Sequence, residues 1–270
     1  MLITSFIEDL YQNIHYFIRL IAIFLSSFLI IIFYLEFKFP LIDYIPFLDI
    51  LFNFPLFNFI FFSLCLVTVV NGSNFIDGMN GLVGFYFVGA IISCLNLCYL
   101  TNDLQNTDLL IICIITMIAF LSLNFPHGKI FAGDSGAYLF SLILGAWVIK
   151  FFSEHEEISS WNAFLIFFYP TMEIIYSYIR KAIMKKSPFL PDRGHLHLKI
   201  YDLINFSTKR PKLSNNLTTI FLSIFWTAPP LMLPLVFDNT LLILLTIILL
   251  IFTYISVNFF VPSIYMKGEI

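Results

Sequence analysis

Long apolar runs separated by short polar segments dominate the pattern of this chain. A helix needs roughly 20 predominantly apolar residues to cross a bilayer, with about 17–25 as the usual range. By that measure the pattern predicts about eight spans, at 20–37, 53–70, 82–101, 108–125, 137–152, 161–179, 217–237 and 240–260. The expected fold is an all-α integral membrane protein, a polytopic helix bundle that forms a single membrane domain over residues 1–270.

Composition supports the membrane class. Of the 270 residues, 60% are hydrophobic and 11% are charged, whereas soluble domains are nearer a quarter charged. The four cysteines all lie inside apolar runs without metal-binding spacing, so neither a disulfide framework nor a cysteine metal site is expected. Prolines interrupt two predicted spans, at Pro170 and at Pro229–Pro230 and Pro234, and are expected to kink them.

The charges sort the connections into two sets. Nine of the 14 Lys and Arg residues lie in 180–216. The connections that alternate with this set hold Lys38 as their one basic residue, together with Glu154, Glu156 and Glu157. Positive-inside bias therefore predicts that residues 1–19, 71–81, 126–136 and 180–216 face the cytoplasm. Every polar cluster whose residues could take part in catalysis or ligand binding falls on that side.

The first cluster is the polar island Asn71–Gly81 between two apolar runs. Polar groups close to the bilayer are costly, so their accumulation indicates function. Asp77, Asn74 and Asn80 offer hard oxygen atoms that suit Mg²⁺. The same residue types also suit a simple turn between two helices.

The second cluster is Pro126–Gly136, with Asp134 at the mouth of the fifth span. A carboxylate there is suited to a metal that neutralises a diphosphate, and Lys129 offers a positive charge to a phosphate. Asp134 and Ser135 are also good helix N-caps, so a structural role fits the same spacing.

The third cluster is Ser187–His197. Arg193 is suited to binding a phosphate bidentately. In an extended segment His195 and His197 would face the same way. Taken alone, the basic segment equally suits contact with anionic lipid headgroups.

Two further acidic features complete the set of candidates. Glu8 and Asp9 are adjacent carboxylates at the membrane mouth, suited to a metal or to a plain acidic terminus. Glu173 lies within a predicted span, seven residues before Arg180 on one helix face. The favoured interpretation is a Glu173–Arg180 ion pair, with substrate binding by Glu173 as the alternative.

Together the clusters resemble glycosyltransferase family 4, the polyprenyl-phosphate N-acetylhexosamine-1-phosphate transferases. Residues 71–82 are similar to the family's Asn-rich Asp-Gly-x-Asp-Gly-Leu loop, and residues 124–136 to its Lys-(Ile/Val)-Phe-x-Gly-Asp-x-Gly loop. Residues 187–197 resemble its Ser-Pro-Phe-x-Pro-Asp-Arg-x-His-x-His segment, and residues 6–11 its Asp-Asp motif. The order of the four motifs matches as well.

The chain departs from the family pattern at several positions. Glu8-Asp9 replaces the paired aspartates, Asn80 replaces the second loop aspartate, and Leu198 replaces a third histidine. Asn80 and the two-histidine pattern resemble the branch that initiates O-antigen and common antigen, rather than the peptidoglycan branch. The chain also begins almost at the Asp-Asp motif, so two or three spans that usually precede it are expected to be lacking.

The resemblance implies transfer of a sugar-1-phosphate, GlcNAc-1-phosphate in the first instance, from a UDP-sugar to polyprenyl phosphate with release of UMP. It implies Mg²⁺, or Mn²⁺ as a substitute, at Asp134 and Asp77, with Asp9, Asp77 and Asp134 as the catalytic residues. Substrate binding falls to a larger set: Asn71, Asn74, Asn80, Lys129, Arg193, His195 and His197.

The expected partners are a UDP-N-acetylhexosamine, polyprenyl phosphate and membrane lipids, with a homodimer left open and nucleic acid not expected. The expected location is the inner (cytoplasmic) membrane, with the active site facing the cytoplasm. Two other functional classes stay open. One is a catalytically dead or truncated paralogue that acts as a membrane partner protein. The other is a transporter, which the clustering of charge at one face disfavours.

Overall fold

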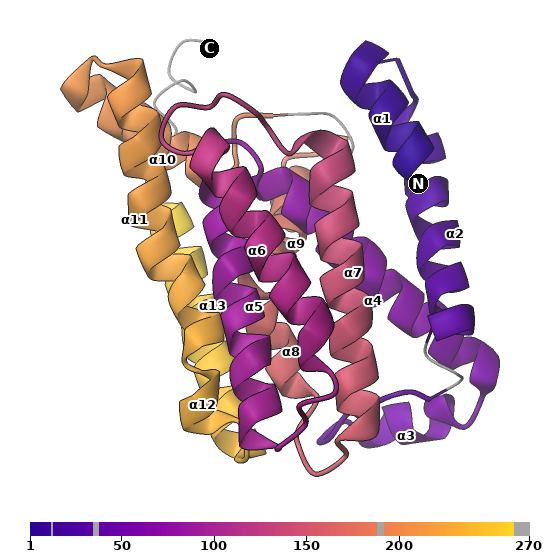
Figure 1. The fold of residues 1–270 in the computed structure, drawn as a ribbon. Helices are drawn as coiled ribbons and strands as arrows, with labels where there is room; N and C mark the ends of the chain where they lie inside the picture. Colours follow the sequence, from indigo (N-terminus) through magenta and orange to yellow (C-terminus); the bar gives the residue numbers. More distant parts are fainter. Residues whose placement is uncertain (12, 35–37, 188–191, 262–270) are drawn as a thin grey trace.

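The computed structural model describes residues 1–11, 13–34, 38–187 and 192–261, and these residues form helices without any strand (Figure 1). The helices of the first half are α1 (Leu2–Tyr11), α2 (Tyr16–Tyr34), α3 (Pro46–Phe52), α4 (Pro55–Ile76), α5 (Leu82–Leu100) and α6 (Thr107–Asn124). Those of the second half are α7 (Gly133–Glu154), α8 (Trp161–Ile166), α9 (Phe168–Ile183), α10 (Leu196–Thr208), α11 (Pro211–Leu231), α12 (Leu233–Val236) and α13 (Thr240–Phe260). The all-α prediction is confirmed.

Six of the described helices are long and apolar enough to span a membrane: α2, α4, α5, α6, α7 and α13. They correspond to six of the predicted spans. The predicted spans at 161–179 and 217–237 are each divided, the first between α8 and α9 and the second between α11 and α12. The prediction of about eight continuous spans therefore becomes six continuous helices and two broken segments, and residues 35–37 of the first span lie outside the described residues.

The break between α8 and α9 follows from Pro170. Proline has no N–H, so Pro170 cannot bond to the carbonyl of Ile166, four residues earlier. In the fold that carbonyl accepts a hydrogen bond from the hydroxyl of Tyr86 on α5. A neighbouring helix thus satisfies the backbone group that the proline leaves free, as a buried or intramembrane carbonyl requires.

The helices form a packed interior with an apolar exterior. The most buried of the six spanning helices are α4, α5 and α7, whose most apolar windows are 56%, 67% and 67% buried, whereas α2, α6 and α13 are 17–22% buried. The outer helices expose large apolar side chains, among them Leu249 and Phe252 of α13. Exposed apolar surface of this extent is a liability in water and is the expected surface toward lipid.

The polar connections gather at the two ends of the bundle. Figure 1 shows α1, α10 and the α6–α7 connection at one end, and α3 and α12 at the other. The glutamates of the α7–α8 connection therefore lie at the end opposite α10, which belongs to the basic segment 180–216, as the charge pattern predicts. Helix α4 packs against α2, α7 and α9, and α1 packs on α7, so the four candidate clusters approach the same end.

Candidate active site

Helix α4 carries part of the first cluster on its last two turns. The helix continues to Ile76, so Asn71 and Asn74 are helical and the connection to α5 contains only residues 77–81. This corrects the predicted loop over 71–81. Gly72 lets α4 approach α9 closely, because a Cβ there would meet the backbone carbonyl of Pro170. Packing against α9 therefore extends the helix past its polar residues.

The short connection 77–81 is bound to the α6–α7 connection. The backbone N–H of Gly81, whose φ of +82° favours glycine, donates to the Asn124 side chain. Asn124 in turn donates to the Ile130 carbonyl at 2.5 Å. The amide nitrogen of Asn80 lies 3.3 Å from the carbonyl oxygen of Pro126. These contacts fix the first and second clusters relative to each other.

Asp9 caps helix α7 from a different helix. Its carboxylate accepts hydrogen bonds from the backbone N–H groups of Asp134 (2.8 Å) and Ser135 (3.0 Å). A helix N-terminus leaves such donors unpaired and favours negative charge. Gly133, with φ of +61°, leaves room for this contact, because a Cβ there would lie 2.9 Å from Oδ1 of Asp9. The cap is supplied by Asp9, not by the Asp134 or Ser135 side chain of the alternative interpretation.

The Asp134 carboxylate lies at the centre of a polar cluster. Its Oδ1 accepts from the Asn74 amide at 2.6 Å, and its Oδ2 accepts from Arg19 at 2.8 Å. The hydroxyl of Tyr138 lies 3.4 Å from the same Oδ2. Arg19 also approaches Glu8, at 3.5 Å. Four helices, α1, α2, α4 and α7, therefore meet around one carboxylate.

Asp77 is the second carboxylate of this cluster. Burial raises its pKa to about 7, the neighbouring charges of Asp134 and Asp9 add to the shift, and the backbone of Gly133 opposes it. The interaction with Asp134 and Asp9 places Asp77 beside the other two acids. Three carboxylates that were predicted from separate motifs are thus brought together.

The third cluster is organised by Glu173 and Asp192. Arg180 binds Asp192 at 2.7 and 3.0 Å, so the predicted Glu173–Arg180 pair is wrong. Glu173 instead binds His195, with 2.9 Å between its Oε1 and Nδ1. Arg180 holds the pKa of Asp192 at about 2, because its hydrogen bonds and charge outweigh the opposing effect of burial. The backbone of Gly194 lies against Arg180, where a Cβ would meet the guanidinium, and this close approach puts Asp192 next to Arg180 and His195 next to Glu173.

The two histidines lie against the end of α4. His195 precedes α10 and His197 lies in its first turn, and the two rings stack at 5.7 Å and 15°. The His195 ring meets Phe75 at 5.0 Å, and a Cβ on Gly78 would meet the His197 ring. Burial lowers the pKa of His197 to about 4, so this ring is neutral at neutral pH. The third cluster therefore adjoins Asp77.

The contacts described for the remaining predicted residues involve groups other than the three carboxylates. The Asn71 amide donates to the Val67 carbonyl of its own helix, and Asn80 faces the α6–α7 connection and α11. Lys129 is exposed. Arg193 is 57% exposed and pairs with Asp202 at 3.2 Å, while residues 188–191 of its segment lie outside the described residues.

Two participants were missed from the sequence. Arg19 had a signal, since it is a lone basic residue at the start of an apolar run, ten residues after Asp9. Tyr254 donates to Oε2 of Glu173 at 2.5 Å, and nothing in its apolar run distinguishes it.

The donor set around Asp134 suits a cation that keeps part of its water shell. Among the described residues no group of three or more His, Cys, Asp and Glu side chains is arranged to hold a metal. Mg²⁺ commonly uses one or two protein carboxylates plus water and substrate phosphates. Asp134 and Asp77 supply such a pair, and Asn74 offers an amide oxygen beside them. The residues fit Mg²⁺ bound together with a phosphate ligand.

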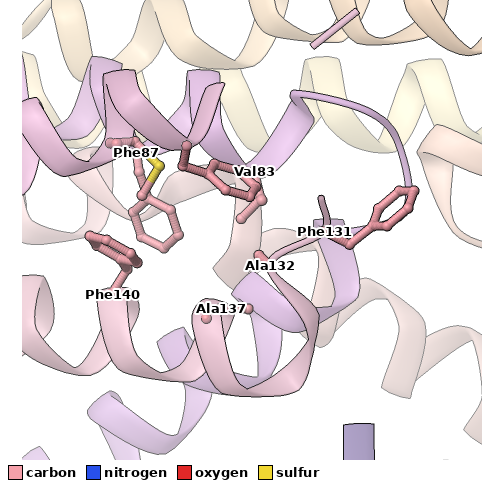
Figure 2. Close-up of a pocket in the computed structure, with 9 residues that line it drawn as sticks. Val83, Phe87, Phe131, Ala132, Ala137 and Phe140 are labelled. Carbon is pink, nitrogen blue, oxygen red and sulfur yellow. The ribbon is translucent and has the colours of Figure 1, made fainter. Parts of the chain in front are cut away.

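An apolar pocket of about 220 Å³ lies on another side of the α7 N-terminus, between α5, α6 and α7 (Figure 2). The rings of Phe87 and Phe140 lie next to each other in it, 6.3 Å apart. Its lining contains no charged side chain. Charged ligand chemistry therefore belongs to the Asp134 side of the helix.

The sequence is similar to those of known proteins. A family model described as glycosyl transferase family 4 matches residues 1–152. The undecaprenyl-phosphate alpha-N-acetylglucosaminyl 1-phosphate transferase of Thermotoga maritima is 31% identical over 140 residues, which cover 51% of this chain and 41% of that protein. The decaprenyl-phosphate N-acetylglucosaminephosphotransferase of Mycobacterium tuberculosis is 28% identical over 158 residues, covering 51% and 39%.

A phospho-N-acetylmuramoyl-pentapeptide-transferase of Leuconostoc mesenteroides is 34% identical over 131 residues, covering 47% of this chain and 38% of that protein. The aligned part of the chain thus spans about two fifths of the length of these relatives. No solved structure matches the chain.

Proposed function

This chain belongs to glycosyl transferase family 4, and we propose that it transfers N-acetylhexosamine-1-phosphate, most simply GlcNAc-1-phosphate, from a UDP-sugar to polyprenyl phosphate. One observation supports the proposal. Asp134 lies near Asp77 and Asp9 and accepts hydrogen bonds from Arg19 and Asn74. This cluster is at the basic end of an apolar bundle. Relatives named as undecaprenyl- and decaprenyl-phosphate transferases of this sugar phosphate support the substrate class.

In the proposed reaction an oxygen of the lipid phosphate attacks the β-phosphorus of the UDP-sugar. A new P–O bond joins the lipid phosphate to the sugar phosphate, and the bond from the β-phosphorus to the bridging oxygen breaks. UMP leaves with that oxygen and its electron pair. A bound Mg²⁺ would offset the repulsion between the two anions and stabilise the charge that develops on the phosphates.

We assign a role in this reaction to each residue from its contacts. Asp134 and Asp77 would hold the metal, with Asn74 orienting Asp134. Both oxygens of Asp9 bind backbone amides of α7, which favours a positioning role for Asp9 over proton transfer. Arg19 offers its guanidinium to a phosphate in the cluster.

The remaining polar residues surround this cluster. His195 and His197 would line the diphosphate side, His197 as a neutral ring. Lys129 and Arg193 are exposed and are assigned to the approach of the anionic substrate, with Asn71 and Asn80 supporting the loops.

An apolar cavity of about 580 Å³ suits the chain of a polyprenyl lipid. It lies between α3, α4, α7, α8 and α9, and its lining includes Phe62, Leu66, Val148, Phe152, Phe164 and Phe167. Because α4 and α7 also carry Asn74 and Asp134, a lipid lying along these helices would bring its phosphate toward the polar cluster. The proposed location is the cytoplasmic membrane, with this cluster facing the cytoplasm.

The test is transfer by the purified full chain in nanodiscs. UDP-N-acetylglucosamine and undecaprenyl phosphate are supplied with Mg²⁺, and UMP release and the lipid-linked product are both measured. Asp134→Asn is expected to abolish product formation, with at least about 100-fold loss in line with a lost charge-stabilising group. Glu156→Gln, an exposed carboxylate at the opposite end, is the matched control.

Two outcomes would overturn the proposal. Near-normal turnover by the Asp134→Asn protein would remove the central carboxylate from the reaction. Absence of lipid-dependent UMP release from the folded wild-type protein, with several UDP-N-acetylhexosamines tried, would favour a non-catalytic partner protein.

A further inference from the structure

Glu173 is a buried carboxylate whose contacts are fully specified. It lies on α9 with 1% exposure. Its Oε1 is hydrogen-bonded to Nδ1 of the His195 ring at 2.9 Å and accepts a hydrogen bond from the backbone N–H of Leu196 at 3.1 Å. Its Oε2 receives the Tyr254 hydroxyl at 2.5 Å. Burying a carboxylate is costly, and donors from α10 and α13 offset that cost here.

These contacts leave one nitrogen of the His195 ring for a ligand. With Nδ1 on Glu173, the other ring nitrogen is Nε2, which lies 3.9 Å from Oδ1 of Asp192, within ion-pair range but beyond hydrogen-bond range. The ring is stacked on His197 and meets the edge of Phe75. Phe75 is two residues before Asp77 at the end of α4. The ring therefore has a fixed orientation next to the carboxylate cluster.

Simple helix packing does not require this arrangement. The neighbouring polar contact between α10 and α13, from Lys199 to Asn258 at 3.1 and 3.3 Å, already joins the two helices. Asn258 lies one turn beyond Tyr254 on the same helix. The Tyr254–Glu173 contact joins a different pair, α13 and α9, and it leads to a histidine beside the candidate site.

We propose that Glu173 is a positioning residue, which holds the His195 ring so that Nε2 is presented to a phosphate oxygen of the sugar-nucleotide diphosphate, and that Tyr254 holds Glu173. The phosphate ligand rests on the proposed function, whereas the orientation of the ring does not. A charged ring would donate through Nε2–H, and a neutral ring with Nδ1–H would accept at Nε2. The interaction with Glu173 thus sets what the ring offers at Nε2.

The first measurement is independent of turnover. In protein carrying ¹⁵N-labelled histidine, with His195→Gln used to assign the signals, the His195 ring is expected to show a protonated, hydrogen-bonded Nδ1. Glu173→Gln is expected to abolish this fixed state, because one end of the amide cannot accept. Tyr254→Phe should shift it in the same direction by less, and serves if Glu173→Gln does not fold. Thr253→Ala is the matched control, because its hydroxyl, on the neighbouring residue of α13, donates to the Leu249 carbonyl of the same helix, and it should leave the His195 signals unchanged.

The second measurement uses kinetics. Loss of a residue that orients a ligand-binding histidine typically costs about 10–100-fold, so kcat/KM for the UDP-sugar should fall by about that factor in Glu173→Gln. The same substitution should have little further effect in a His195→Gln background, since the two residues would act as a unit.

Unchanged His195 signals in Glu173→Gln, or equal effects of Thr253→Ala and Tyr254→Phe, would overturn the positioning role. A change in the ring signals in a protein without transferase activity would support the positioning role and reject the proposed function, so the two failures are distinguishable.

Discussion

The Asp134 carboxylate is held between an amide and a guanidinium. Asn74 occupies Oδ1 and Arg19 occupies Oδ2, so neither oxygen depends on water alone. Arg19 also lies 3.5 Å from Glu8, which spreads its charge over two acids. In this way three helices bring acidic side chains together while one cation limits their mutual repulsion. The arrangement is suited to a cluster that receives anionic substrates and a cation together.

Asp77 is expected to make the stability of the fold depend on pH. Its pKa is raised to about 7, mainly by burial, from an unfolded value near 4. Ionised Asp77 therefore destabilises the fold, and this cost grows as pH rises from about 4 and is complete above pH 7. Asp77→Asn should raise the melting temperature at pH 8 in EDTA, corresponding to roughly a few kcal/mol, and should change it little at pH 4.

Thermal unfolding in detergent at the two pH values measures this difference. Asp238→Asn, an exposed acid beside α13, is the control and should show no such pH-dependent gain. Equal melting temperatures of wild type and Asp77→Asn at pH 8 would contradict the burial of an ionised group. The same variant should lose transfer, which would make Asp77 a site where function opposes stability.

At the scale of elements, α7 begins where another helix caps it. Gly133 has φ of +61° and lies against Asp9 of α1, so the start of α7 depends on a residue far away in sequence. The helix-starting residue Ala132 has no side-chain cap of its own. The position of Asp134 is therefore set jointly by α1 and α7.

Gly133→Ala tests the contact between Asp9 of α1 and the N-terminus of α7. The substitution forces a left-handed conformation on alanine and places its Cβ 2.9 Å from Asp9. Loss of the cap should destabilise the protein by about 1–2 kcal/mol and lower transfer. Gly136→Ala, on the first turn of the same helix with Ala132 as its nearest contact, should cost less stability, as judged by denaturation in mild detergent. Equal losses for the two alanines would contradict the capping role of Asp9.

At the scale of the whole molecule, the bundle separates lipid chemistry from phosphate chemistry. The polar cluster lies at one end of α4 and α7, and the apolar cavity of about 580 Å³ is lined by residues 61–69 of α4 and 145–152 of α7, toward the end that carries α3. A substrate with a charged head and a long apolar chain matches this division. The broken segment α8–α9 lines the cavity and also carries Glu173, so it serves both regions.

Cys65→Trp would fill the cavity from α4. It should raise KM for undecaprenyl phosphate while leaving KM for the UDP-sugar and the use of a short-chain polyprenyl phosphate nearly unchanged. Ile248→Trp, on the outward face of α13, is the matched control because that residue is 63% exposed. If both tryptophans had the same effect on the long-chain substrate, the cavity would have no part in lipid binding.

The sequence by itself determined the membrane class, the approximate positions of six spanning helices and the sorting of charge between two ends. These depend on local properties, because an apolar run of sufficient length forms a helix in lipid whatever its neighbours are. It also indicated Asp9, Asp77 and Asp134 as candidate catalytic residues, since acidic groups beside apolar runs are conspicuous.

Only the tertiary structure decided which residues meet. Helix α4 continues through Asn71 and Asn74 where Gly72 packs on α9. The close approach of Gly194 to α9 pairs Arg180 with Asp192 and His195 with Glu173. Partners such as Arg19 on Asp134 and Tyr254 on Glu173 come from helices 81 to 115 residues away. Pairings over such separations depend on how helices lie side by side, and no local pattern encodes that choice.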